Sequence, residues 1–494
     1  MRVRTAAAVA AFLIPFAVYI ASIAPDVGYW DTADLQTVSY IFGIAHATGF
    51  PAFIFAGWLF SHAIPFGTVA WRVGLVSAVA MAAAAYFVYA TVVELEEKPV
   101  VGTFAAMFFA FGEVAWTRGS RAEAHALELG FASFAVWSLL RWRRTGRKNA
   151  LYGTALAYGL ALATHPVAIL MAPGLVLLLF PRIVETSRRT IAAAVLCAIL
   201  PGLLYLYLPL RSAYVTEHRI DPMLALGTCG REAFWDFGHP ATLGGLVRYL
   251  GAGEQGSARS GLREMLSLDR YPGVITQFLD LAHSEYGAIA LLLAALGLFL
   301  LERKNSFLTL GLFLACMASV PFGLVFVEAD PARYLLTAFW FIAILVAVGV
   351  GRATAALFPR REDLGTFVAI AVMCALAGSR VVVNYQSIER QHGFTARVFV
   401  NRVLAGTPDN ALLVANWPFA TPLGYVENVE HGLGHRLVIT AQATACKGSY
   451  AEWLKSRPLF LVNTTYPDTD FRAIVVAHDP TLVRIESKDA RGSL

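Results

Sequence analysis

The stretch TAAAVAAFLIPFAVYIASIA, residues 5–24, is followed directly by PDVGYWDTAD, residues 25–34. The first part is an apolar run of the length that crosses a bilayer as one helix, which takes about 20 residues. The second part is a polar segment that contains two acidic residues, Asp31 and Asp34. A membrane span that opens into an acidic loop predicts the class of fold and points to a candidate site.

The composition extends this pattern to the whole chain. Of its 494 residues, 57% are hydrophobic and 15% are charged, whereas about 25% of the residues in a soluble protein are charged. Residues 5–24 exceed the length of a leader's apolar core, and Pro25 follows the only small-residue cleavage site, so we interpret them as a retained span. We expect about eleven spanning helices, with approximate cores at 5–24, 69–93, 99–117, 122–140, 150–164, 166–181, 191–209, 286–301, 307–327, 334–351 and 364–380.

The short loops differ strongly in their content of Lys and Arg, which predicts orientation. One side has sixteen such residues: Arg2, Arg4, Lys98, Arg141, Arg143, Arg144, Arg147, Lys148, Arg182, Arg188, Arg189, Arg303, Lys304, Arg352, Arg360 and Arg361. The short loops of the other side have only Arg118, Arg121 and Arg333. The first side is therefore expected to be cytoplasmic, with the N-terminus on it.

Three segments are then extracytoplasmic: 25–68, 210–285 and the tail 381–494. We expect a transmembrane domain over 1–380 and a small α/β domain over 381–494. Strand-like runs in the tail lie at 411–417, 436–440 and 459–463, and helix-like runs lie at 385–404, 421–432 and 450–456. Their alternation favours a parallel sheet.

Several classes of function are disfavoured. The net charge of +5 is not gathered into a block that would suggest nucleic-acid binding. The 5 cysteines have no CxxC or Cys/His spacing, so no zinc or redox site is indicated. Cys229 and Cys446 both fall in extracytoplasmic segments, where a disulfide between them is one alternative and two unrelated thiols are the favoured one.

Asp31 and Asp34 are three residues apart, so they share one face if a helix begins at Thr32. In that case Asp31 is the N-cap, and the helix extends to about Phe42. Two carboxylates on one face repel each other and raise one pKa, which suits a general base or a metal-binding pair. Plain capping is the alternative, and the spacing alone favours it over catalysis.

Other ionisable residues collect on the same side of the membrane in this topology. They are Glu113, Arg118, Arg121, Glu123, His125, His165, Arg211, Asp330 and Arg333. Each alone is more often paired or snorkelling than functional, but their collection on one side indicates a cavity. Arginine suits an anionic group there because its fork matches two phosphate oxygens.

Three motifs resemble the signature of a known family. Asp31-Thr32-Ala33-Asp34 resembles an Asp-Ser-Gly-Glu element, and His46-Ala47-Thr48-Gly49-Phe50-Pro51 resembles a His-Pro-Pro-Gly-Tyr-Pro element. Arg121-Ala122-Glu123-Ala124-His125 resembles an Arg-Ala-Glu-Val-Tyr element. Later landmarks are Gly159-Leu160-Ala161 with His165, Pro209-Leu210-Arg211-Ser212, and 235–240. The family is one of GT-C membrane glycosyltransferases, long described as a domain of unknown function, that includes the vertebrate transmembrane protein O-mannosyltransferase.

The resemblance covers about the first 250 residues with motifs, and the departures at 34, 47, 48 and 125 mark a divergent member. It implies a GT-C-like fold and transfer of a sugar, with inversion, from a polyprenyl-phosphate donor to an extracytoplasmic acceptor. The acceptor would be a protein hydroxyl, a glycolipid or a polysaccharide. Asp31 matches the acidic residue that serves such enzymes as general base or positions the acceptor.

The chemistry of such a transfer gives roles to the other candidate residues, since the leaving lipid phosphate needs cationic stabilisation. Asp34 is the second catalytic candidate. Candidates for substrate binding are His46, Arg121, Glu123, His125, His165, Arg211 and Arg333. A divalent cation is compatible with such enzymes, and no residue here demands one.

Two other classes of protein compete with a transferase. A transporter or flippase for a lipid-linked sugar would place ionisable groups near the bilayer midplane, often in repeated halves. Here the acids fall in outer loops, and no repeat is visible in the sequence. A binding or assembly protein would use the tail 381–494 to recruit partners.

Overall fold

The computed structural model describes residues 2–180, 182–226, 233–251, 267–326, 330–391, 395–441, 449–464 and 471–487. Cys229 and Cys446 lie outside the described residues. The chain forms two compact units. Unit 1 draws on Met1–Ile23, Ser77–Leu204 and Gly256–Gln391, and unit 2 draws on Ala24–Val76, Tyr205–Gln255 and His392–Leu494.

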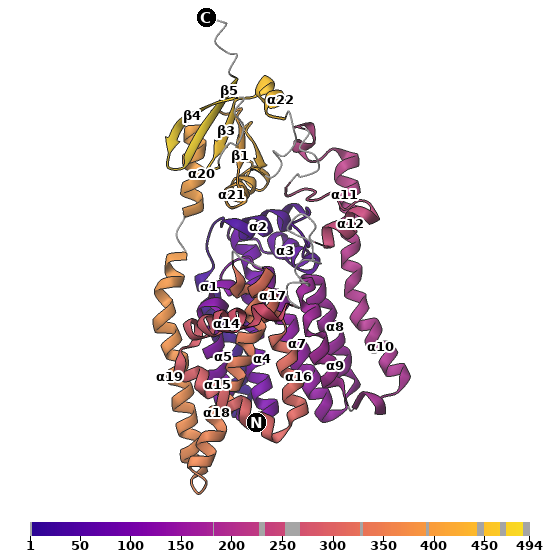
Figure 1. The fold of residues 1–494 in the computed structure, drawn as a ribbon, viewed down its shortest axis with the longest axis vertical. Coiled ribbons are helices and arrows are strands. Elements are labelled where there is room, and N and C mark those ends of the chain that lie inside the picture. The colour runs from indigo at the N-terminus through magenta and orange to yellow at the C-terminus, as the bar shows by residue number, and fades with distance from the viewer. Residues whose placement is uncertain are drawn as a thin grey trace, which may run out of the picture. The chain divides into compact units, whose positions relative to one another are not determined.

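Unit 1 is a bundle of helices (Figure 1). Its elements are α1 (Arg2–Ser22), most of α4 (Val69–Glu96), α5 (Pro99–Ala110), α6 (Glu113–Gly119), α7 (Ala124–Thr145), α8 (Lys148–Thr164), η1 (Pro166–Met171), α9 (Ala172–Leu179), η2 (Arg182–Glu185), α10 (Arg188–Ile199), most of η3 (Leu200–Leu206), η5 (Leu268–Arg270), α14 (Tyr271–Tyr286), α15 (Ala288–Lys304), α16 (Ser306–Met317), α17 (Ser319–Phe326), η6 (Pro331–Leu335), α18 (Leu336–Leu357) and α19 (Glu362–Gln391). Each of the eleven predicted cores overlaps one to three consecutive helices.

The burial of these helices shows which lie inside the bundle. The most apolar window of Pro331–Leu357 is 94% buried, whereas that of Glu362–Glu389 is 17% buried and that of Arg188–His218 is 22% buried. All three are strongly apolar, so the outer two expose surface that only lipid covers favourably. The chain is therefore a multi-pass membrane protein with α18 at the centre of its helix bundle.

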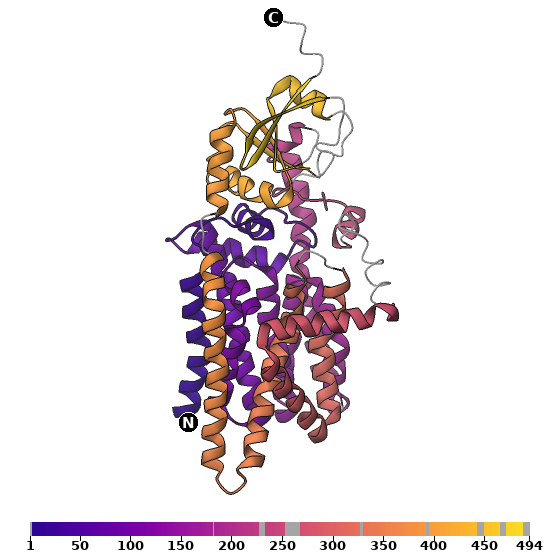
Figure 2. The same cartoon turned by 60° about the vertical axis from the view of Figure 1, so that its left-hand side comes forward.

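The number of spans depends on how two bent pairs of helices are counted. Among the described residues, six helices are long and apolar enough to cross a membrane, or up to eight if two bent pairs each form one span. The pairs are α5 with α6, bent by 75°, and α14 with α15, bent by 113°. Figure 2 shows α14 lying across the other helices of the bundle. The count of about eleven and the orientation remain predictions.

Unit 2 combines helices with one five-stranded sheet. Its elements are α2 (Trp30–Ile41), α3 (Pro51–Ala63), the first residues of α4, α11 (Tyr207–His218), η4 (Pro222–Leu226), α12 (Leu243–Leu250), α20 (Thr395–Gly406), β1 (Leu412–Ala415), α21 (Trp417–Asn428), β2 (Leu437–Thr440), α22 (Ser449–Ser456), β3 (Leu459–Val462), β4 (Phe471–His478) and β5 (Thr481–Ser487). Segment 25–68 is therefore largely helical.

The sheet has the strand order β2-β1-β3-β5-β4. Strand β1 pairs in parallel with β2 and β3, as the alternation of strands and helices predicts, and Leu412 lies opposite both Leu437 and Leu459. The three strands that the sequence predicted are therefore parallel to one another. Two further strands, β4 and β5, were not predicted, and β5 pairs antiparallel with β3 and with β4. Only Asp479 and Pro480 connect β4 to β5, which is too short for the crossover that parallel strands need.

Helices cover both faces of this sheet. Phe399 of α20 and Leu423 of α21 pack with Leu413 on one face, and Trp453 of α22 packs with Leu412 on the other. Ala33 of α2 joins the first of these cores. The acidic segment near the N-terminus and the sheet near the C-terminus therefore share one hydrophobic core.

A buried acid in this unit makes its stability depend on pH. Oε1 of Glu427 is buried and has no hydrogen-bond partner among the described residues. Burial, and then the charge of Asp221, raise the pKa of Glu427 from 4.5 to about 8. Folded protein therefore keeps a proton that unfolded protein loses, and stability decreases as pH rises from about 4.5 to 8.

Glu427→Gln is expected to raise the free energy of unfolding at pH 8 by about 1–3 kcal/mol. The neutral amide of glutamine does not have to take up a proton when the protein folds, whereas the carboxylate of Glu427 does. The melting temperature of the purified protein, followed from pH 5 to 8, should decrease less in the variant than in the wild type. Glu452→Gln is the matched control, since Glu452 forms an exposed pair with Lys455. Parallel curves for wild type and Glu427→Gln would contradict the assignment.

Candidate functional site

Asp31 lies in the first turn of α2, so the prediction that it is the N-cap of this helix is wrong. The helix begins at Trp30 with Tyr29 as N-cap, and no side chain caps it. Tyr29 is held outside the helix because its hydroxyl donates to the Thr395 carbonyl and its ring packs against Phe399. The carboxylate of Asp31 is therefore not used for capping, and its side chain is 27% exposed.

His46 lies between the two carboxylates of α2. Its Nδ1 is 2.7 Å from Oδ2 of Asp34, and its Nε2 is 3.7 Å from Oδ2 of Asp31. The exposed fraction of the side chain falls from 27% for Asp31 to 10% for His46 and 0% for Asp34. The three groups thus form a chain from a partly exposed acid, through an imidazole, to a fully buried acid.

Opposed effects act on the pKa of Asp34. Burial raises the pKa of Asp34 above its ordinary value, and the charge of Asp31 adds to the rise, while the hydrogen bond and charge of His46 oppose it. Its Oδ1 is buried without a hydrogen-bond partner among the described residues. The sequence predicted that repulsion would raise one pKa of the pair. The direction agrees, but burial is the main cause.

The loop that carries His46 is fixed by side chains that the sequence did not identify. The Tyr249 hydroxyl donates to the carbonyls of Ala45 at 2.5 Å and His46 at 3.3 Å. The Ile44 amide donates to the Phe234 carbonyl, and a Cβ at Gly43 would collide with that oxygen. These contacts come from 205–255, which the sequence linked to the site only through Arg211 and a resemblance to family landmarks.

Trp417 is the second residue that the sequence did not identify. It is the first residue of α21, and its Nε1 donates to Oδ1 of Asp31 at 2.9 Å. Its ring also contacts His46 edge-on, with centroids 5.6 Å apart. No local pattern could have indicated this pair, because the two residues are 386 positions apart.

Arg211 also belongs to unit 2. It donates to the carbonyl of Ile41 at the end of α2, and its guanidinium lies over the rings of Tyr214 and Trp235. Its Nε is buried and has no hydrogen-bond partner among the described residues. The Nε–H of Arg211 is a donor that could bind an anionic group, the role that the sequence analysis gave to this residue.

In unit 1, Arg118 and Arg121 share two acids. Arg118 is 6% exposed and donates to Glu123 at 3.1 Å and to both oxygens of Asp330 at 2.6 and 2.7 Å. Arg121 is 32% exposed and lies 3.6 Å from Glu123 and 3.7 Å from Asp330. Arg118 is thus occupied by its ion pairs, while Arg121 is the more accessible cation of the cluster.

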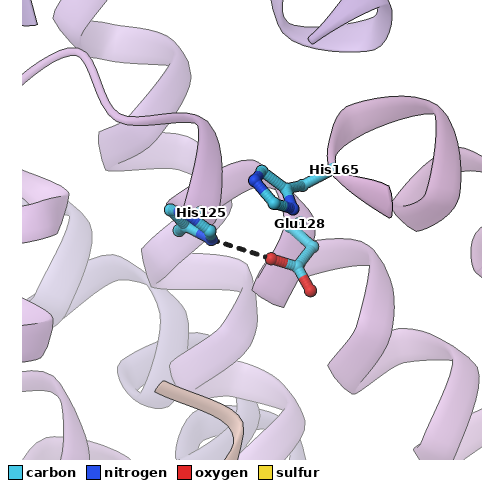
Figure 3. A group of neighbouring side chains, drawn as sticks. All are labelled: His125, Glu128 and His165. Atoms are coloured by element: carbon cyan, nitrogen blue, oxygen red, sulfur yellow. Dashed lines mark hydrogen bonds and ion pairs between the residues drawn. The ribbon is translucent and has the colours of Figure 1, made fainter. Parts of the chain in front are cut away.

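His125, Glu128 and His165 form a second group in unit 1 (Figure 3). Their ligand-type atoms lie within 4.8 Å of one another, and Nδ1 of His125 is 3.0 Å from Glu128. Tyr334, which follows Arg333, contacts both histidine rings. The three candidates His125, His165 and Arg333 are thus neighbours.

The donor set of this group does not fit a metal ion well. Nδ1 of His165 accepts the Val167 amide at 3.1 Å, so the proton of the neutral ring is on Nε2. A metal ligand needs a lone pair on the nitrogen that faces the ion. His165 would have to give up its amide hydrogen bond, and the group therefore fits a hydrogen-bonded cluster better.

The sequence predicted a GT-C-like fold with a helical membrane domain and a small C-terminal α/β domain. ArnT from Cupriavidus metallidurans, in the apo state, aligns with a TM-score of 0.53 over 96% of this chain and 96% of its own, at 13% identity. The two proteins share a fold, and the expectation of a GT-C-like membrane fold is confirmed.

The sequence comparisons find similarity to the family that the motifs resemble. Residues 31–188 match the family model of the protein O-mannosyl-transferase TMEM260 N-terminal domain. The protein O-mannosyl-transferase tmem260 of Dictyostelium discoideum is 24% identical over 444 residues, 80% of this chain and 52% of its own length. The TMEM260 protein of Mus musculus is 26% identical over 257 residues, 50% of this chain and 34% of its own. The resemblance found in the motifs is confirmed. The matched part of the chain spans 52% of the length of the first relative and 34% of the length of the second.

Proposed function

We propose that this chain is a membrane glycosyltransferase in which Asp31 is the general base. It takes a sugar from a polyprenyl-phosphate carrier and transfers it to a hydroxyl group on the extracytoplasmic side. The observation that carries the proposal is the chain of groups from Asp31 through His46 to Asp34. The similarity to O-mannosyl-transferases supports it and makes a mannosyl donor and Ser/Thr peptides the first substrates to test.

The tautomer of His46 follows from its partners. Oδ2 of Asp34 accepts the backbone amide of His46 and is 2.7 Å from Nδ1, so Nδ1 carries the ring proton and donates it to Asp34. The lone pair of Nε2 then faces Asp31. His46 can therefore take a proton from Asp31 while Asp34 holds the ring in place.

The reaction needs one proton acceptor. The acceptor hydroxyl attacks the anomeric carbon of the sugar, the bond from that carbon to the phosphate oxygen breaks, and the hydroxyl proton passes to Asp31. The products are the glycoside and the polyprenyl phosphate. A single displacement of this kind inverts the anomeric centre. A positioned carboxylate contributes about 100- to 10,000-fold to such a step.

The leaving phosphate gains negative charge and needs cationic stabilisation. Arg211 is the proposed source, because it belongs to the same unit as Asp31 and its buried Nε has no hydrogen-bond partner among the described residues. Arg118 is instead assigned a structural role, since its two terminal nitrogens donate to Glu123 and Asp330.

The test is sugar transfer by the purified protein in proteoliposomes. A radiolabelled polyprenyl-phosphate mannose is supplied with a library of Ser/Thr peptides, and labelled glycopeptide and free polyprenyl phosphate should appear in equal amounts. Movement of the lipid-linked sugar between leaflets without a product would overturn the proposal and favour a flippase. Binding of peptides without either activity would favour an assembly protein.

Asp34→Asn is expected to lower kcat about 100-fold, the size of one acid–base contribution. Asparagine can turn its amide toward Nδ1, which moves the ring proton to Nε2 and removes the lone pair facing Asp31. Steady-state transfer rates over a range of peptide concentrations check this, and KM should change little. Thr37→Ala is the control one turn away, where a buried hydroxyl donates only to the Ala33 carbonyl. Equal kcat values for wild type and Asp34→Asn would exclude Asp34 from the reaction.

A further inference from the structure

We infer that Trp417 of the C-terminal sheet domain is a positioning residue for Asp31, so that this domain completes the catalytic centre. The inference rests on the proposed function. Trp417 donates its indole N–H to Oδ1 of Asp31, while Oδ2 of the same carboxylate faces Nε2 of His46. The two oxygens of Asp31 therefore have different neighbours, and the indole determines which oxygen faces the histidine.

The indole suits this role because it can donate but cannot accept a hydrogen bond. It therefore cannot take the proton that Asp31 receives from the hydroxyl. A hydrogen bond to Oδ1 restricts rotation of the carboxylate and holds Oδ2 toward Nε2. Orientation of this kind contributes strongly to catalysis, because a small displacement of a reacting group lowers the reaction rate.

Trp417 is held on a rigid element. It begins α21 immediately after β1, with Pro418 at a position that favours the start of a helix. The preceding residue, Asn416, bonds to the Asn463 carbonyl and the Thr464 hydroxyl beyond β3. The indole thus projects from the edge of the sheet where two parallel strands end.

The helix α21 is also fastened to the segments that build the site. The Tyr425 hydroxyl accepts the Ala70 amide at 3.1 Å, and Oδ1 of Asn428 accepts the indole of Trp235 at 2.8 Å. Gly424 leaves room for the Phe234 ring, which a Cβ would strike. With the bond from Trp417 to Asp31, three hydrogen bonds connect α21 to residues 24–76 and 205–255.

A further ion pair anchors the sheet domain to the same segment. Arg397 of α20 donates to both oxygens of Asp26, just before α2, and also to Glu430 just after α21. These contacts fix the distance between α2 and α21. A change at Trp417 should therefore affect the carboxylate of Asp31 without moving the helices.

The experiment compares Trp417→Phe with Trp453→Phe in the full-length protein. Trp453 is a matched control because it lies in the same domain and donates its indole to a backbone carbonyl, that of Leu226. Trp417→Phe keeps the aromatic contact with His46 but loses the donor. We expect kcat for sugar transfer to decrease 10- to 100-fold with KM for the peptide within twofold, while Trp453→Phe keeps the wild-type kcat. An unchanged kcat in a folded Trp417→Phe variant would overturn the inference.

A double variant separates positioning from packing. If Trp417 acts through Asp31, then Trp417→Phe should cause no further loss of rate on the Asp31→Asn background. Equal additional losses on both backgrounds would mean that the indole acts independently of Asp31 and would also overturn the inference. Full activity of Asp31→Asn alone would instead refute the role of Asp31 in the proposed function, so the two failures can be told apart.

Discussion

Asp31→Asn is expected to reduce the rate of sugar transfer by about 100- to 10,000-fold, the largest effect on activity that the site predicts. The amide has the size of the carboxylate but cannot accept a proton from the hydroxyl. Because Asp31 is partly exposed and does not cap its helix, the loss should be in kcat and not in folding. Initial rates with radiolabelled donor, and the melting temperature of the same preparation, check both parts.

The control for this variant is Asp479→Asn. Asp479 is 85% exposed, lies between β4 and β5, and pairs with Arg402. Its replacement removes the same charge elsewhere in unit 2 and should change the rate less than twofold. If Asp31→Asn transferred sugar at the wild-type rate, the general base would have to be another residue.

Arg118→Met is expected to destabilise unit 1 by about 3–5 kcal/mol, the cost of removing one partner from a buried ion pair. Two acids, Glu123 and Asp330, would lose their principal cation. Glu123 also caps α7 and exchanges hydrogen bonds with Ser77. The loss should therefore spread to the turn between α6 and α7, and a lower yield of monodisperse protein and a lower melting temperature would report it.

Two further variants test the cause of this loss. Arg121→Met should cost less than about 1 kcal/mol, because Arg121 is 32% exposed and has longer contacts with the same acids. Arg118→Met combined with Glu123→Gln and Asp330→Asn should recover much of the stability, since no buried charge is then left unpaired. An Arg118→Met protein as stable as the wild type would show that the network carries no stability.

The features that the sequence predicted well are those set by local pattern. Long apolar runs predicted the membrane helices, because an apolar segment of this length is stable in a bilayer only as a helix. Short strand-like runs between helices predicted β1, β2 and β3 close to their observed bounds. The run Ala473–Ala477 followed by Asp479-Pro480 also held a signal for a hairpin, which the sequence analysis did not use. Asp31 and Asp34 were found by motif and share His46 in the structure.

What the sequence did not predict depends on contacts between distant segments. Tyr249 fixes the His46 loop from more than 200 positions away, and Trp417 reaches Asp31 from further still. Such pairs follow from tertiary packing, in which neither residue has a distinctive local environment. Arg118 and Arg121 likewise look equivalent in the sequence. Only their burial distinguishes them: Arg118 is buried in its ion pairs, whereas Arg121 is accessible enough to be a candidate for binding.

The separation of 386 positions between Asp31 and Trp417 has a consequence for biosynthesis. The ribosome delivers α2 early and α21 near the end, so a nascent chain whose helices have all been inserted still lacks the indole. The proposed transferase should therefore stay at least 10- to 100-fold below its full rate until α21 has been made, and chains that stop before residue 417 should remain in the membrane at that low rate. Protein synthesis itself would then limit when glycosylation can begin.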